Sequence, residues 1–127
     1  MSTTNSIPGS NANFISLNTA IDMTSRYRSD KESILALSYQ NQNILPNSET
    51  FNRNAFDVLL ALDACAALRI YYGMDANSKV HAIIVPVNSS NQDILPFSNA
   101  LSISNPGIVE EGQRCPDLCP PSSSLNS

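Results

Sequence analysis

Two kinds of residue in this sequence could carry chemistry: a pair of cysteines near the C-terminus and a single histidine. Three residues separate Cys115 from Cys119. This spacing permits a small disulfide, two thiolate ligands for a metal ion, or two free thiols. The third cysteine, Cys65, makes the number odd, which fits neither a disulfide framework nor a complete zinc site. These three interpretations stay open, and the sequence predicts no metal ion and no cofactor.

The histidine, His81, lies in a run of strand-forming residues. A general base needs a cleft and an orienting partner, and the sequence specifies neither. We therefore expect His81 to be a packed, hydrogen-bonded residue; a pocket around it with a strongly shifted pKa would point to catalysis instead. Neither a Gly-x-Ser-x-Gly nucleophile elbow nor a phosphate-binding glycine loop occurs among the four glycines. The sequence predicts a non-enzymatic protein with no catalytic residue.

The element expected to position these residues is a β-hairpin over residues 65–87. Two runs rich in Ile, Val and Tyr flank residues 75–78, whose short polar side chains favour a turn. A four-residue turn places Tyr72 opposite His81 and puts the apolar residues of both strands on one face. The full expected register pairs Met74 with Lys79, Tyr72 with His81, Ile70 with Ile83 and Leu68 with Val85.

Two amphipathic helices are predicted to pack on this hairpin. The first begins after Ser16, a suitable N-cap, and its apolar residues recur at helical spacing as far as Tyr27. We assign residues 31–39 to helix as well, although they also alternate as a strand would. The second helix is expected to begin near Thr50 or Phe51. Its apolar stripe consists of Phe51, Ala55, Val58, Leu59 and Leu62.

The fold class predicted from these elements is α+β, with two main helices packed on an antiparallel hairpin-based sheet. At 127 residues the chain has the length of one domain. We assign residues 1–15 to a polar N-terminal arm, 16–104 to a single α+β domain and 105–127 to a C-terminal tail that contains prolines and cysteines. Because a two-stranded hairpin is marginal alone, we expect the region of Ile94 or Ile108, or a neighbouring molecule, to add a strand.

A short near-repeat lies outside these elements. Residues 91–98 closely match residues 41–48, and each copy contains the sequence Ile-Leu-Pro. We interpret the repeat as a recurrent turn followed by an apolar plug into the core; the alternative is a shared binding motif. In that alternative the interaction residues would be Ile94, Leu95, Pro96 and Phe97.

The composition limits the partners of this protein. Only 14% of residues are charged and the net charge is -4, so no basic face exists to bind phosphates, and we expect no nucleic-acid partner. The apolar runs are shorter than about ten residues, too short for a membrane span. A surface so poor in charge is weakly protected against self-association. We therefore predict a structural or protein-interaction module that forms a homo-oligomer or filament by exchange of its arm or tail. The alternative is a thiol redox or metal-binding module that uses Cys115 and Cys119.

The first residues of the chain bear on its compartment. They contain neither a basic residue nor an apolar run, so they do not fit a secretory signal peptide. We expect the cytoplasm, with export by a route that needs no cleavable signal as the alternative.

Three segments carry a resemblance to a known group of proteins. They span residues 48–53, residues 68–75 together with 79–82, and residues 110–123, which include Glu-Glu-Gly-Gln-Arg-Cys-Pro and Cys-Pro-Pro-Ser-Ser. Over about residues 15–127 the chain resembles a group of small uncharacterised proteins from Bacteroidota. The resemblance implies a bacterial source. Because that group has no established activity, it implies no catalytic residue.

Overall fold

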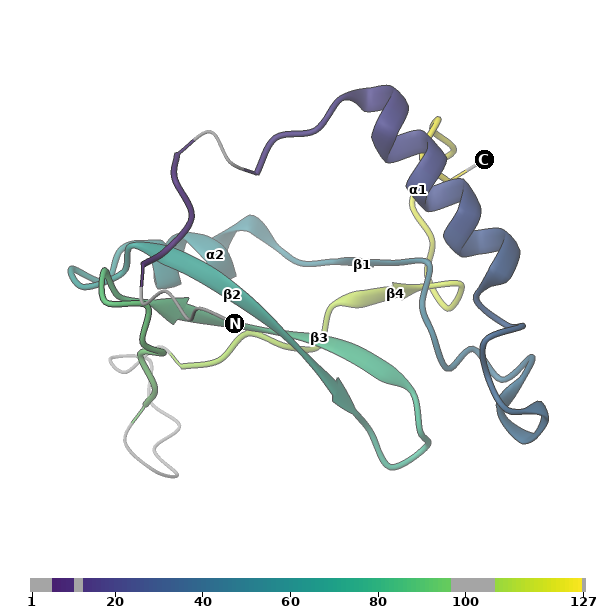
Figure 1. Cartoon of the computed structure of the whole chain (residues 1–127). Coiled ribbons are helices and arrows are strands. Elements are labelled where there is room, and N and C mark those ends of the chain that lie inside the picture. Colours follow the sequence, from purple (N-terminus) through teal and green to yellow (C-terminus); the bar gives the residue numbers. More distant parts are fainter. Residues whose placement is uncertain (1–5, 11–12, 97–106, 127) are drawn as a thin grey trace.

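The structure, a computed structural model, describes residues 6–10, 13–96 and 107–126 (Figure 1). These residues form two α-helices and two small antiparallel sheets, which confirms the α+β class. The elements in chain order are α1 (Leu17–Asp30), the 3-10 helix η1 (Leu37–Tyr39), β1 (Ser48–Thr50), α2 (Arg53–Leu60), β2 (Ala67–Met74), β3 (Val80–Val87) and β4 (Gln113–Cys115).

Strands β2 and β3 form the predicted hairpin, but the predicted register is wrong by one residue. Gly73, and not Tyr72, lies opposite His81. The reason is the turn, in which the Asp75 N–H donates to the Lys79 carbonyl at 3.0 Å and Ser78 has a φ of 65°. A three-residue loop that ends in a left-handed residue replaces the expected four-residue loop.

The shifted register changes the residues that share a face of the hairpin. The side chains of paired residues point to the same side of the sheet. A slip by one residue therefore moves all side chains of one strand to the opposite face relative to the other strand. One face carries Leu68, Ile70, Tyr72 and Met74 with Val80, Ala82, Ile84 and Pro86. The other face carries Ala67, Arg69, Tyr71 and Gly73 with His81, Ile83, Val85 and Val87.

Strand β3 lies at the centre of the core, and its C-terminal half, residues 84–87, is fully buried. Its outer edge, which faces away from β2, is bonded by segments from distant parts of the chain. The bonds join Val80 N–H to Ile44 O (2.8 Å), Ala82 N–H to Glu49 Oε1 (2.8 Å), Ile84 N–H to Val109 O (2.9 Å) and Ile94 N–H to Pro86 O (2.9 Å). Both regions expected to add a strand therefore reach this edge, each through a single bridge.

A second sheet pairs β1 with β4, from Ser48 opposite Cys115 to Thr50 opposite Gln113. Its central residue, Arg114, is charged and only 5% exposed. The guanidinium group donates to three backbone carbonyls and lies 3.5 Å from the carboxylate of Asp117. The three acceptors are the carbonyls of Val80, Asn43 and Ile44. Arg114 and Cys115, which lie in the predicted C-terminal tail, thus contribute to the folded core.

Helix α1 has the predicted N-cap, since Ser16 Oγ accepts the Thr19 N–H at 3.1 Å. The helix ends at Asp30, so the prediction of helix over 31–39 is wrong: turns and η1 occupy that segment. Polar side chains there bond the local backbone and compete with the helix. Ser33 Oγ donates to the Asp30 carbonyl, and Gln40 Nε2 donates to the Leu35 carbonyl.

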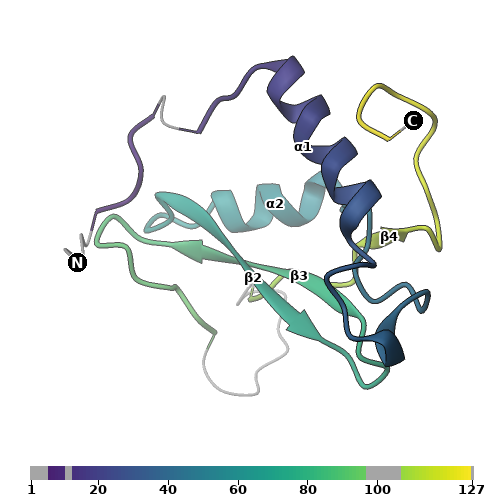
Figure 2. The same cartoon turned by 45° about the vertical axis from the view of Figure 1, so that its right-hand side comes forward.

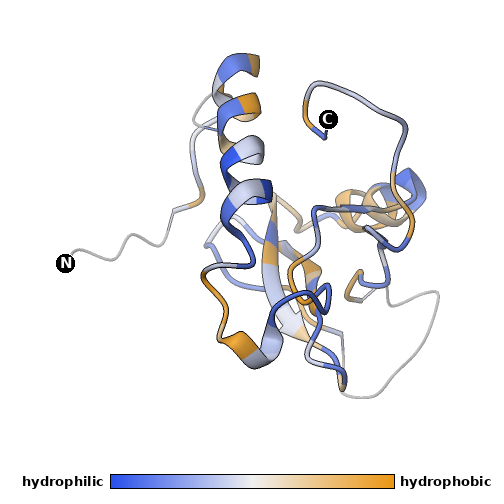
Figure 3. Ribbon diagram, turned by 90° about the vertical axis from the view of Figure 1, so that its right-hand side faces the viewer, coloured by the Kyte–Doolittle hydropathy of each residue, from blue (hydrophilic) through white to orange (hydrophobic). Residues whose placement is uncertain are grey.

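Helix α1 buries none of its residues completely and is held by polar contacts. Tyr27 donates from its hydroxyl to Pro46 O at 2.7 Å, and Lys31 Nζ donates to Leu45 O at 2.9 Å. Arg28 donates to the carbonyl of Leu125, which lies in the C-terminal segment beside α1 (Figures 1 and 2). In Figure 3, hydrophilic and hydrophobic residues alternate along the whole length of α1, whereas most of α2 has the colour of hydrophobic residues.

Helix α2 begins at Arg53, slightly after the predicted start, because Thr50 belongs to β1. Its N-cap is Asn52, whose Oδ1 accepts the Asn54 N–H at 2.8 Å. Leu59 is the one residue of α2 that is fully buried, with 1% of its surface exposed. Helix α2 therefore contributes to the core mainly through Leu59.

Replacing Arg114 tests the importance of its contacts. We expect Arg114→Ala to lower the free energy of unfolding by about 3 kcal/mol, because three carbonyls, that of buried Ile44 among them, lose the charged donor that a buried guanidinium group supplies. The control is Arg53→Ala, whose exposed ion pair with Asp57 should contribute less than about 0.5 kcal/mol. Urea unfolding measures both; equal effects would contradict the assigned role of Arg114.

Candidate interaction surface

No described segment of the chain covers the outer edge of β2. The bond between Asp75 N–H and Lys79 O fixes which residues of β2 face β3, because bonded pairs alternate along an antiparallel ladder. The backbone groups of four residues consequently point away from β3: Leu68, Ile70, Tyr72 and Met74. Within residues 6–10, 13–96 and 107–126, no hydrogen bond satisfies these outward groups.

The side chains along this edge are apolar and exposed. The exposed fractions are 55% for Ile70, 78% for Tyr72 and 66% for Met74. Natural edge strands usually carry a charged residue or proline, which opposes pairing with another chain. Arg69 is the one charged residue of β2, and it forms an ion pair with Asp93. This edge therefore lacks the usual protection against strand addition.

A polar cluster neutralises Arg69 on the other face of β2. Asp93 accepts hydrogen bonds from the Tyr71 hydroxyl and from Arg69, and Arg69 also donates to the side chain of Asn91. The hydrogen bond from Tyr71, together with Arg69, lowers the pKa of Asp93, while the same bond raises the pKa of Tyr71. The cluster ties residues 91–93 to β2 and leaves no unpaired charge on the strand.

His81 lies in a cleft of about 430 Å³ near the hairpin turn. Its Nε2 is 2.7 Å from Asp75 Oδ2, and its Nδ1 is 3.1 Å from Glu110 Oε1. The His81 hydrogen bond, helped by the Lys79 N–H, lowers the pKa of Asp75 to about 2. No Ser, Thr or Cys lines the cleft. Because both ring nitrogens face carboxylates, the arrangement joins the loop at Glu110 to the hairpin.

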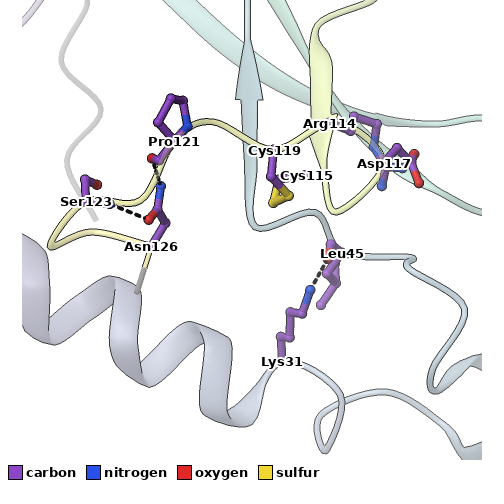
Figure 4. The surroundings of a disulfide bond; sticks show 9 residues. All are labelled: Lys31, Leu45, Arg114, Cys115, Asp117, Cys119, Pro121, Ser123 and Asn126. Atoms are coloured by element: carbon purple, nitrogen blue, oxygen red, sulfur yellow. Dashed lines mark hydrogen bonds and ion pairs between the residues drawn. A yellow bond between two sulfur atoms is a disulfide. The ribbon is translucent and has the colours of Figure 1, made fainter.

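The C-terminal cysteines form a disulfide, Cys115 to Cys119 (Figure 4). Cys115 is buried beside Arg114, whereas Cys119 is exposed. Cys65 is a free thiol whose Sγ donates to the Ala67 carbonyl. In the described part of the chain, no group of three His, Cys, Asp or Glu residues is placed to hold a metal ion. Of the three interpretations of the cysteine pair, the structure contains the disulfide.

The Ile-Leu-Pro segments both dock on the outer edge of β3. Ile44 is buried and accepts from Val80 at one end, while Ile94 donates to Pro86 at the other end. Each segment follows an asparagine with positive φ, Asn41 at 62° and Asn91 at 64°. Of the other predicted interaction residues, Leu95 is 59% exposed, Pro96 is half-buried, and Phe97 lies outside the described residues.

Comparison of the chain with protein-family models, with curated proteins and with solved structures found no match. The resemblance to Bacteroidota proteins therefore stays a prediction. Among the described residues, no helix has the length and apolar character needed to cross a membrane.

The Asp75–His81 contact predicts a pH dependence of stability. The folded pKa of Asp75, about 2, lies below its ordinary 3.8, so its contribution is present above pH 3.8 and is lost as the pH falls through 2. We expect the wild type to lose more unfolding free energy than Asp75→Asn between pH 4 and pH 2, as measured by urea unfolding. The exposed Asp63→Asn serves as control and should follow the wild type; parallel curves for all three proteins would refute the prediction.

Proposed function

We propose that this protein is a non-enzymatic interaction module that self-associates through the open edge of β2. One observation carries the proposal: every N–H on the outer edge of β3 has an acceptor, whereas the outward N–H groups of β2 have none among the described residues. An unpaired edge is a template for another strand. A second copy of β2 supplies a strand with equally unpaired groups, and its one charged residue, Arg69, is already paired with Asp93.

Two copies of β2 can satisfy each other in a single symmetric register. Bonded pairs must join outward-facing residues, which are the even-numbered ones, and the register that uses all of them is centred on Tyr71. In that register Leu68 lies opposite Met74 of the second copy, and Ile70 lies opposite Tyr72. All outward backbone groups of both strands then find a partner, and the contact is the same patch on both copies, as two-fold symmetry requires.

The sequence prediction of arm or tail exchange supplies the competing contact. Residues 1–15 or 105–127 would then cross between subunits. The two contacts differ in the residues that they need, so substitutions in β2 and truncation of the arm distinguish them.

A charge placed on the edge tests the proposed contact. We expect Ile70→Lys to weaken self-association at least about tenfold, because pairing would desolvate the new ammonium group. Leu60→Lys on α2 is the matched control, since Leu60 is equally exposed at 55%. Light scattering after size exclusion should show twice the 13.7 kDa chain mass for the wild type and Leu60→Lys. A monomeric wild type at high concentration would end the proposal.

A cysteine substitution tests the register. In a Cys65→Ser background, Tyr71→Cys should form an intermolecular disulfide under mild oxidation. In the proposed register the two copies of residue 71 lie opposite each other, with about 4.5 Å between their Cα atoms. Met74→Cys is the control: residue 74 faces residue 68, so its own copies lie far apart. Non-reducing electrophoresis reads the result, and equal crosslinking of both variants would exclude this register.

A second candidate function is a thiol redox module, favoured by the disulfide between Cys115 and the exposed Cys119. Attack by an external dithiol on Cys119 would release the two thiols while the dithiol becomes a disulfide. Closing so short a loop should stabilise the fold by about 2 kcal/mol. We therefore expect Cys119→Ser to lower the unfolding free energy by about that amount, whereas Cys65→Ser changes it little. In folded wild type, a thiol count that does not rise reversibly with dithiothreitol would exclude this candidate.

A further inference from the structure

A groove of about 530 Å³ lies between β1, the start of α2 and the hairpin face that carries Ile70 and Tyr72. Its size is within the range typical of small-molecule sites. The walls are mainly aromatic and aliphatic: Phe51, Phe56, Ile70, Tyr72, Ala82 and Ile84. The side chains of Ile70 and Tyr72 line the groove, whereas the proposed self-association uses the backbone groups of the same residues.

One carboxylate lines this apolar groove, that of Glu49. Its Oε1 accepts the Ala82 N–H at 2.8 Å, which fixes the side chain against β3. Its Oε2 is buried and has no hydrogen-bond partner in the part of the chain that the structure describes. A buried polar atom without a partner is rare and calls for a ligand or a function.

No cation of the described chain pairs with Glu49. Its cross-strand neighbour is Arg114, but that guanidinium group donates to backbone carbonyls and pairs with Asp117. The charge of Arg114 is thus satisfied elsewhere, and Glu49, which lines the groove, keeps one carboxylate oxygen without a donor among the described residues.

The aromatic wall of the groove is held in place. The rings of Phe51 and Phe56 are 5.7 Å apart between centroids. Gly112 packs against Phe51 so closely that a Cβ there would lie 2.7 Å from Phe51 Cζ. A side chain at residue 112 would displace the ring, so glycine at this position keeps the wall as it is.

We propose that this groove binds a small organic cation with a primary ammonium head and an apolar body. The ammonium group donates to Glu49 Oε2, and the apolar body contacts the aromatic and aliphatic walls. Aromatic faces also attract cations, which adds to the preference for a positive head. A bare metal ion does not fit, because the lining offers one carboxylate and, besides it, only the neutral hydroxyls of Ser48, Thr50 and Tyr72, which are too few ligands for a hard cation.

Three matched probes test the proposal on the full chain: hexylammonium, hexan-1-ol and hexanoate. Titration followed by amide chemical shifts should show hexylammonium binding at least about tenfold more tightly than the alcohol, with shifts centred on residues 49–56. Hexanoate should bind most weakly. Equal binding of the three probes, or no saturable binding of hexylammonium, would overturn the proposal without any variant.

Glu49→Gln gives a second, independent measurement. Glutamine keeps a carbonyl oxygen for the Ala82 N–H but removes the charge, so the preference for hexylammonium over hexan-1-ol should vanish. The control is Glu111→Gln, an exposed carboxylate that does not line this groove. Loss of the preference in both variants, or in neither, would show that Glu49 does not recognise the ammonium group.

Discussion

The fold depends on hydrogen bonds along the outer edge of β3. Residues 84–87 are buried, so water cannot satisfy the backbone there, and each outward N–H must find an acceptor in the protein. Within this buried half the outward N–H of Ile84 bonds the Val109 carbonyl, and in the half-buried part of the strand the N–H groups of Val80 and Ala82 bond the Ile44 carbonyl and the Glu49 carboxylate. Pro86 has no N–H to satisfy and points to the same edge. This explains how a proline fits in the most buried part of the strand.

Arg114 joins this edge to the second sheet. Its side chain bonds the carbonyl of Val80, at the start of β3, and those of Asn43 and Ile44, which approach the same end. A single buried guanidinium group thus replaces several backbone contacts that a longer sheet would provide. The small core can remain stable with short strands because charged side chains complete their hydrogen bonding.

Local features of this fold were predictable from sequence, and long-range polar contacts were not. The Ser16 cap and the hairpin follow from patterns of neighbouring residues. The register depends on the left-handed conformation of Ser78. A glycine or an asparagine at this position would have predicted that conformation, but a serine does not. Glu49 and Arg114 reach partners far along the chain, and no spacing rule identifies such residues. The near-repeat did contain usable information, because Asn41 and Asn91 share their positive φ and precede segments that dock on the same edge.

The contrast between the two edges of the hairpin limits the assemblies that strand pairing can build. Pairing of β2 with a second β2 would give a sheet whose outer edges are both β3. Each of those edges is already bonded by Ile44, Glu49, Val109 and Ile94 of its own chain. Such a sheet has no free edge on which to grow, so edge pairing alone closes at two copies. A filament would require a second, different contact, such as exchange of the arm or the tail. The hydrogen bonds along the outer edge of β3 therefore stabilise the monomer and also prevent open-ended growth of the hairpin sheet.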